Sequence, residues 1–102
     1  MSEQRVLQPK IRTRPKVERP RMHKVILVND DFTPREFVVL VLKRVFGMRP
    51  ERAYGVMMTA HQKGCCVVAV YTRDIAETKA TEATDAGRQN GYPLLFTTEP
   101  EE

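Results

Sequence analysis

The junction VNDDFTPREF, at residues 28–37, constrains the fold of this chain more than any other stretch. The apolar run HKVILV that leads into it is short and rich in β-branched residues, which favours a strand. Thr33, Pro34 and Glu36 then have the spacing of a capping box with proline in the first helical turn. We therefore expect a strand that leaves its sheet here and a helix that starts at Pro34, with Thr33 as its N-cap.

Glycine and proline divide the next part of the chain. The first helix is expected to end near Phe46, because Gly47 follows it. Pro50 is well placed to open a second helix, and Gly64 is well placed to end it. The shared face of that second helix, at i, i+4, i+7 and i+8 spacing, consists of Ala53, Met57, Ala60 and His61.

The remainder predicts two strands around a third helix. CCVVAVY, residues 65–71, is β-branched and apolar throughout, which indicates a central strand buried on both faces. A third helix, capped by Thr72, should run to about Asn90, and YPLLFTT should form the last strand. The inward stripe of that helix is small, with Ile75 as its one bulky anchor, and consists of Ala76, Ala80, Ala83 and Gly87.

The resulting order is β-α-α-β-α-β. It predicts an α/β (α+β) fold in which three helices lie on one face of a small three-stranded sheet. A chain of 102 residues has room for one such domain.

The positive charge is concentrated at the N-terminus. Residues 1–21 carry a net charge of +5, whereas residues 22–102 carry −1. The first segment also holds three prolines and few apolar residues, so we expect a disordered basic extension ahead of a folded domain at 22–102. It is either an interaction segment or a solvated leader with no specific partner.

The chain carries no sign of a membrane or secreted protein. Apolar runs such as FVVLVL are far shorter than the roughly 20 residues that span a bilayer, and the N-terminus lacks the apolar region of a signal peptide. Cys65 and Cys66 are neighbours that cannot close a stabilising loop, so we expect two buried thiols in a reducing compartment. A cytoplasmic location is the expectation.

Catalysis and metal binding are poorly supported. A nucleophilic cysteine paired with His61 would need an accessible thiol, and only Lys63 lies near enough in sequence to lower its pKa. Asp30, Asp31 and the histidines have no zinc or calcium spacing. We expect no enzyme activity, no metal and no cofactor.

Nucleic-acid binding has little support beyond the extension. The chain has no Gly-x-x-Gly loop and no aromatic residues interleaved with basic strand residues. An RNA- or ribosome-associated module that uses its basic arm remains the alternative function, although no specific nucleic-acid partner is expected.

The remaining polar cluster consists of Asn29, Asp30, Asp31 and Thr33 at the strand exit, with His61 near the end of the second helix. Taken singly, each residue is explained by a backbone turn, a helix cap or a helix-end histidine. Together with MMTAHQKG, VAVYTRDIAETK and NGYPLLFTTEPE, however, NDDFTPREFVVLVLKRVFG closely resembles the ClpS family of proteolytic adaptors. Four motifs in the right order cover about residues 23–101.

The resemblance implies an adaptor domain related in shape to the C-terminal domain of the ribosomal stalk protein. Such adaptors are monomers that bind N-degrons, substrates whose first residue is Phe, Tyr, Trp or Leu. They deliver these substrates to the unfoldase ClpA of the ClpAP protease, which engages the N-terminal extension during delivery.

The resemblance also assigns residues. Asn29, Asp31 and His61 would accept hydrogen bonds from the α-amino group, and Asp30 between them would orient the loop or the substrate. The first side chain would enter a pocket formed by Thr33, Pro34, Arg35, Val38, Met57, Ala60 and Leu94.

Two pocket positions depart from the family, which commonly has Met at Arg35 and Val at Ala60. We expect Phe and Tyr to be retained as first residues. Asp74 and Lys79 on the third helix would contact the N-domain of ClpA.

Overall fold

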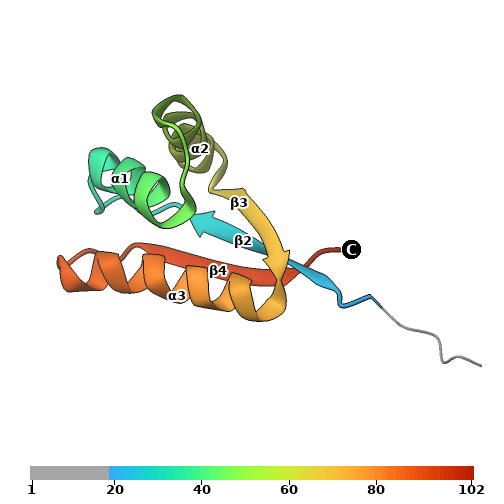
Figure 1. The fold of residues 1–102 in the computed structure, drawn as a ribbon. Helices are drawn as coiled ribbons and strands as arrows, with labels where there is room; N and C mark the ends of the chain where they lie inside the picture. The colour runs from blue at the N-terminus through green and yellow to red at the C-terminus, as the bar shows by residue number, and fades with distance from the viewer. Residues whose placement is uncertain (1–18) are drawn as a thin grey trace, which may run out of the picture.

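The computed structural model describes residues 19–102, so the expected extension lies almost entirely outside the described residues. The predicted order β-α-α-β-α-β is confirmed (Figure 1). The elements are β2 (Met22–Val28), α1 (Arg35–Phe46), α2 (Pro50–Lys63), β3 (Cys65–Thr72), α3 (Arg73–Gln89) and β4 (Leu95–Pro100).

The sheet has the order β3-β2-β4, and β2 is antiparallel to both neighbours. The expectation that β3 is a central strand buried on both faces is therefore wrong, because β3 lies at an edge. Of its residues only Val68 is fully buried, and a bulge interrupts its pairing with β2 between Val25 and Ile26. The expectation of two buried thiols is also wrong, since Cys65 is exposed and Cys66 only half-buried.

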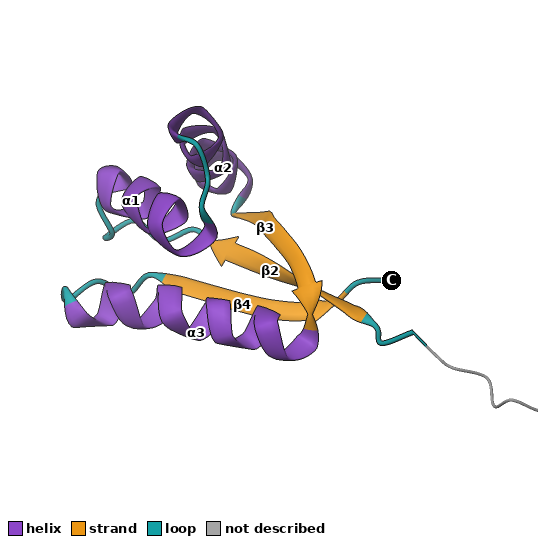
Figure 2. Cartoon of the chain, in the orientation of Figure 1, coloured by secondary structure: helices purple, strands orange, loops and turns teal. Residues whose placement is uncertain are grey.

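The three helices pack against one face of the sheet and build a single core with it (Figure 2). From the central strand, Val25 and Leu27 point into this core and are almost fully buried. Because side chains alternate along a strand, Ile26 and its two cross-strand partners, Val67 and Thr97, face the other side of the sheet. Val67 is 45% exposed there.

The start of α1 differs from the predicted capping box. Pro34, with an extended backbone, is the N-cap, and its carbonyl accepts hydrogen bonds from the N–H groups of Phe37 and Val38 at 3.0 and 3.2 Å. Thr33 stands one residue too early to cap the helix, and its hydroxyl donates to Asp30 instead. The expected role of Thr33 as N-cap is therefore wrong.

The predicted glycine stop signals are confirmed at the C-terminal ends of α1 and α2. Gly47 and Gly64 have positive φ angles of 66° and 94°, which favour glycine, and their N–H groups donate to Leu42 and Ala60 of the preceding turn. Thr72 is the N-cap residue of α3 as expected, but its side chain makes no capping hydrogen bond.

Helix α3 lies along the sheet on its small residues. The expected stripe of Ala76, Ala80, Ala83 and Gly87 is buried, but Ile75 is 47% exposed and does not anchor the helix. The last strand begins at Leu95, three residues later than expected, because Tyr92 and Leu94 belong to the loop before it.

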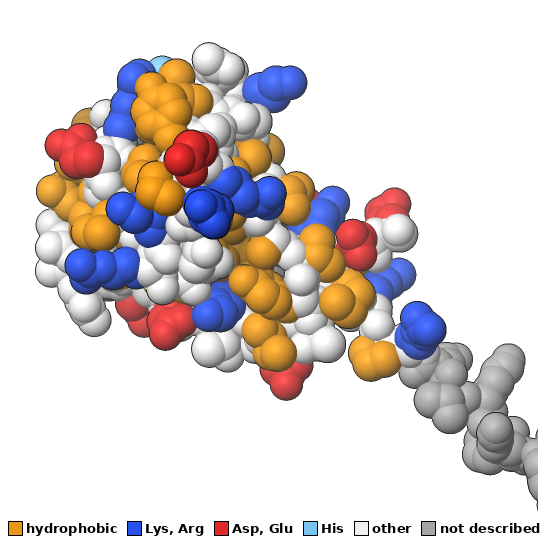
Figure 3. Space-filling model, turned by 45° about the horizontal axis from the view of Figure 1, so that its top comes forward, with side chains coloured by type: hydrophobic (Ala, Val, Ile, Leu, Met, Phe, Trp, Pro, Cys, Tyr) orange, Lys and Arg blue, Asp and Glu red, His pale blue; other side chains and the backbone are white. Residues whose placement is uncertain are grey.

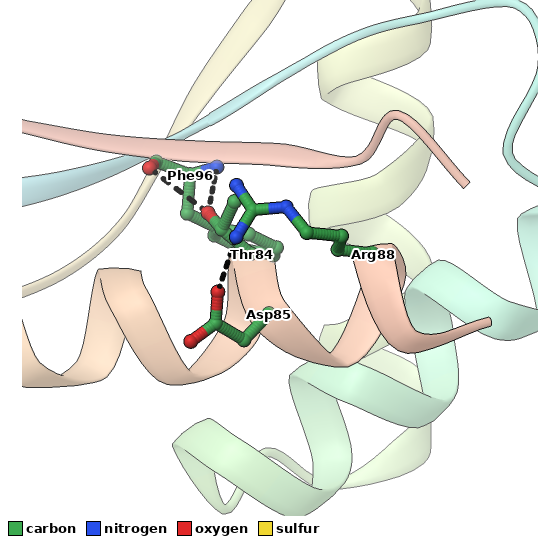
Figure 4. A network of polar contacts seen from close by, with 4 residues as sticks. All are labelled: Thr84, Asp85, Arg88 and Phe96. Atoms are coloured by element: carbon green, nitrogen blue, oxygen red, sulfur yellow. Dashed lines mark hydrogen bonds and ion pairs between the residues drawn. The ribbon is translucent and has the colours of Figure 1, made fainter. Parts of the chain in front are cut away.

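The outer edge of β4 is tied to α3 by a side chain (Figure 4). The Thr84 hydroxyl accepts a hydrogen bond from the Phe96 N–H at 3.0 Å and donates to the Phe96 carbonyl at 3.3 Å. One turn along, Arg88 pairs with Asp85 at 2.9 Å. Thr84 thus satisfies backbone groups that an edge strand would otherwise leave unpaired.

None of the helices within residues 19–102 is long and apolar enough to cross a membrane.

Candidate functional site

One pocket of about 300 Å³ collects the residues that the sequence predicted. It opens between the β2–α1 loop, the C-terminal half of α2 and the loop before β4. Every residue assigned to the amine or to the first side chain lines it: Asn29, Asp30, Asp31, Thr33, Pro34, Arg35, Val38, Met57, Ala60, His61 and Leu94.

Three further lining residues were missed by the sequence reasoning: Leu27, Val28 and Phe32. Leu27 and Val28 were treated only as strand residues. Phe32 carried a signal, because a large aromatic side chain in the middle of a polar turn has no core to enter. It is 79% exposed.

Asp30 shapes the loop. Its Oδ1 accepts hydrogen bonds from the N–H groups of Phe32 and Thr33 at 2.8 and 2.7 Å, and its Oδ2 accepts one from the Thr33 hydroxyl at 2.9 Å. Both carboxylate oxygens are therefore used within the loop. This geometry is that of a residue that orients the loop, the first of the two roles considered for Asp30.

A backbone hydrogen bond joins the two polar segments of the rim. The N–H of Asn29, just after β2, donates to the carbonyl of Gly64, just after α2, at 2.9 Å. This bond continues the β2–β3 ladder, in which Val28 pairs with Cys65. It holds the last turn of α2, which carries His61, beside the strand exit.

The rim offers two unused acceptors and a third that Arg35 holds. Within residues 19–102, neither the Asn29 amide nor the Asp31 carboxylate is engaged in a side-chain hydrogen bond, whereas Asp30 makes three. His61 is exposed, and its Nε2 lies 3.0 Å from Nη2 of Arg35. An amide oxygen, a carboxylate and an imidazole therefore surround one opening.

The floor of the pocket is apolar and continuous with the protein core. Val38 comes from α1, Met57 and Ala60 from α2, and Leu94 from the loop before β4, and all four are buried. Thr33 is buried beside them, with its hydroxyl turned to Asp30. The opening is polar and the floor is apolar, so the pocket suits a ligand that has a charged group next to an apolar side chain.

Asp74 and Lys79 lie on α3 and do not line this pocket. Asp74 is exposed in the first turn. The Lys79 ammonium donates to the Val45 carbonyl at the end of α1 at 2.9 Å, so one of its three N–H groups ties two helices together.

The thiols have no catalytic arrangement within the described residues. His61 is bonded to Arg35 rather than to a cysteine. Burial raises the pKa of the Cys66 thiol, the nearby Cys65 thiol raises it further, and Arg52 opposes both. Within residues 19–102 no three potential metal ligands lie together.

The surface charge of the folded domain is mixed. On the face shown in Figure 3, Lys and Arg side chains lie among apolar and acidic ones, and some of them adjoin one another. The RNA-associated alternative rests on the basic extension, which lies almost entirely outside the described residues, and it stays a prediction.

Comparison with known proteins decides the family. A family model described as "ATP-dependent Clp protease adaptor protein ClpS" matches residues 18–97. The chain belongs to the ClpS family.

Among ClpS proteins it is 70% identical to adapter protein ClpS 1 of Bradyrhizobium diazoefficiens over 97 residues, which cover 95% of this chain and 96% of the relative. It is 62% identical to adapter protein ClpS 2 of Agrobacterium fabrum over 96 residues, which cover 94% of this chain and 93% of the relative.

A solved ClpS structure has the same fold. It is that of Agrobacterium tumefaciens ClpS2 bound to L-phenylalaninamide, which is 63% identical with a TM-score of 0.81. The match covers 81% of this chain and all of that chain. The resemblance seen in the sequence motifs is confirmed, and the ClpS fold extends over the three-stranded sheet and its helices.

Proposed function

We propose that this ClpS protein is an N-degron adaptor. It binds the free N-terminus of proteins that begin with Phe, Tyr, Trp or Leu and delivers them to the ClpA unfoldase of the ClpAP protease. One observation carries the proposal: a single pocket has three hydrogen-bond acceptors at its rim and a buried apolar floor.

The chemistry of this pocket matches an N-terminal aromatic residue. An α-ammonium group is a cation with three donors, and Asn29, Asp31 and His61 offer three acceptors. A bulky apolar side chain contributes about 1.5 to 3 kcal/mol on burial, and each hydrogen bond to a charged group contributes about as much. Both halves are needed to reach the roughly 8 kcal/mol of a micromolar complex.

The ligand of the related ClpS2 structure supports the same reading. L-Phenylalaninamide has a free α-amine, a benzyl side chain and an amide where the next peptide bond would begin. It is therefore the smallest mimic of a protein that starts with Phe. The sequence identity of 63% supports a similar ligand for this chain.

Delivery requires a second surface. We assign the contact with the ClpA N-domain to Asp74 and Lys79 on α3, which leaves the pocket free to hold a substrate at the same time. The basic residues 1–21 serve as the segment that ClpA engages. Both partners would meet as a monomeric adaptor and a ClpA ring in the cytoplasm, with no catalysis by the adaptor.

Peptides that differ only at the amine test the binding step. Fluorescence anisotropy compares a labelled peptide that begins with Phe with its N-acetylated form and with one that begins with Ala. We expect acetylation to weaken binding at least about tenfold, because it removes the charge and two donors. Equal affinity of the free and acetylated peptides would falsify the proposal.

A charge reversal tests delivery. Asp74→Lys should abolish capture of the ClpA N-domain while peptide affinity is kept, and Glu82→Lys, an exposed acid on the same helix, is the matched control. Deletion of residues 1–21 should slow ClpAP degradation of a Phe-initiated substrate without weakening peptide binding. Loss of peptide binding in that deletion would contradict this division of roles.

A further inference from the structure

The hydrogen bond between Arg35 and His61 determines which ring nitrogen of the imidazole carries a proton. Guanidinium groups only donate, so the Nε2 atom of His61, 3.0 Å from Arg35 Nη2, must be the acceptor. The ring is then neutral, with its proton on Nδ1. The one acceptor that the imidazole possesses is occupied by Arg35.

An α-ammonium group cannot share that lone pair. Under the proposed function the amine of the ligand needs His61 as an acceptor, and Arg35 already donates to it. Two cations therefore compete for one nitrogen atom. Binding of the amine must release the guanidinium from His61.

The released guanidinium remains close to the ligand. It starts at 3.0 Å from the atom that the amine will contact, and the second Cα of a peptide lies only about 3.8 Å from the first. Arg35 is exposed, and within residues 19–102 no carboxylate forms a salt bridge with it. It is therefore free to bind a new partner at the place where the second residue of the ligand emerges.

We propose that Arg35 is a specificity residue for the second position of the ligand, where it selects an acidic side chain. The inference rests on the proposed function. A carboxylate of Asp or Glu at residue two accepts the released guanidinium and offsets the hydrogen bond lost to His61. A neutral residue there leaves Arg35 without a partner among the described residues.

The charges on the rim predict opposite preferences for an acidic second residue with and without Arg35. Asp30 and Asp31 lie on the same rim and repel a second-position acid. Without Arg35 the site should therefore disfavour Asp at residue two, and with Arg35 it should favour it. Removal of one side chain is expected to invert the preference.

The test measures the affinities of three peptides, Phe-Asp, Phe-Asn and Phe-Lys followed by the same sequence, for three proteins: wild type, Arg35→Met and Arg44→Met. We expect the wild type to bind Phe-Asp about threefold to fivefold more tightly than Phe-Asn, the range of a partly exposed ion pair. Arg35→Met should bind Phe-Asn more tightly than Phe-Asp. Arg44→Met, which removes an exposed cation elsewhere on α1, should behave as the wild type.

An equal Asp-to-Asn ratio in the wild type and Arg35→Met overturns the inference. If acetylated Phe-Asn still binds more weakly than free Phe-Asn in that case, the proposed function stands and only the role of Arg35 fails. If neither form binds at all, both fail together. High salt should reduce the wild-type preference for Phe-Asp, since the new contact is an ion pair.

Discussion

Gly87 and Leu94 approach so closely that a Cβ atom on Gly87 would stand 2.7 Å from the Cβ of Leu94. Gly87 is buried in α3, and Leu94 belongs to the floor of the pocket. The Tyr92 N–H also donates to the Gly87 carbonyl at 2.8 Å, which fixes the loop between them. The position of the pocket floor is therefore set by the absence of a side chain on a helix outside the pocket.

Gly87→Ala should lower both stability and peptide affinity. The added methyl group forces Leu94 outward, and such overpacking costs about 1 to 3 kcal/mol. Gly55→Ala is the matched control, because a Cβ there meets nothing within 4 Å and α2 gains about 0.4 to 1 kcal/mol. Urea unfolding and anisotropy with a Phe-initiated peptide measure both effects, and a shift of the same sign in the two variants would contradict the packing argument.

Substitutions of the two rim aspartates should affect different measurements, the free energy of unfolding for Asp30 and peptide affinity for Asp31. Asp30→Ala leaves three donors of the loop without an acceptor and should lower the free energy of unfolding by about 1 to 2 kcal/mol. Asp31→Ala, an exposed substitution, should change it by no more than about 0.5 kcal/mol. Asp31→Ala should nonetheless weaken binding of the Phe-initiated peptide about tenfold or more. A stable Asp30→Ala protein would argue against a loop-shaping carboxylate.

Thr84→Val should loosen the edge of the sheet. The valine keeps the volume but removes both hydrogen bonds to Phe96, at a cost of about 1 to 3 kcal/mol. Thr81→Val, on the exposed side of the same helix, should be neutral within about 0.5 kcal/mol. Hydrogen exchange of the Phe96 amide gives a local readout, and unchanged protection in Thr84→Val is the result that refutes the contact.

The two thiols should alkylate at different rates. Burial raises the pKa of Cys66, so at a given pH less of it is thiolate, the reactive form. Its reaction with iodoacetamide should accelerate only at higher pH, and Cys65, which is exposed, should be labelled first. Mass spectrometry of Cys65→Ser and Cys66→Ser resolves each site, and faster labelling of Cys66 at pH 8 would be incompatible with its burial.

The element order was predictable because each boundary carries a local signal. Gly47 and Gly64 adopt the left-handed conformation that their positions suggested, and Pro50 opens α2. The buried stripe of small residues on α3 could also be predicted, because its alanines recur at helical spacing and so share one face of the helix. These features depend on residues close together in the sequence.

Features that depend on distant partners were not predictable. CCVVAVY has the composition of a central strand, but its place at the edge depends on β4, which joins the other side of β2. Thr33 was predicted as a helix cap because the capping pattern ignores Asp30, whose carboxylate binds the Thr33 hydroxyl. Ile75 faces outward because the small residues beside it already bring α3 against the sheet.

The residues of the pocket were predicted by two kinds of reasoning. The surplus of polar groups at residues 29–33 could be recognised from the sequence alone, as could His61 at a helix end. Only the family resemblance brought Leu94 to the same place, because it lies more than 50 residues beyond Asn29 and no local pattern connects them. The bond between Arg35 and His61 could not be foreseen from either source.

The floor of the pocket is made of the same side chains as the hydrophobic core, whereas the rim is made of loop residues and exposed helix ends. A change in the size of the accepted first residue therefore requires a repacked core, with its cost in stability. A change at Asp31, Arg35 or Phe32 does not, because these residues are exposed. In evolution or in the laboratory, new substrate preferences should therefore arise at the rim before the floor is altered.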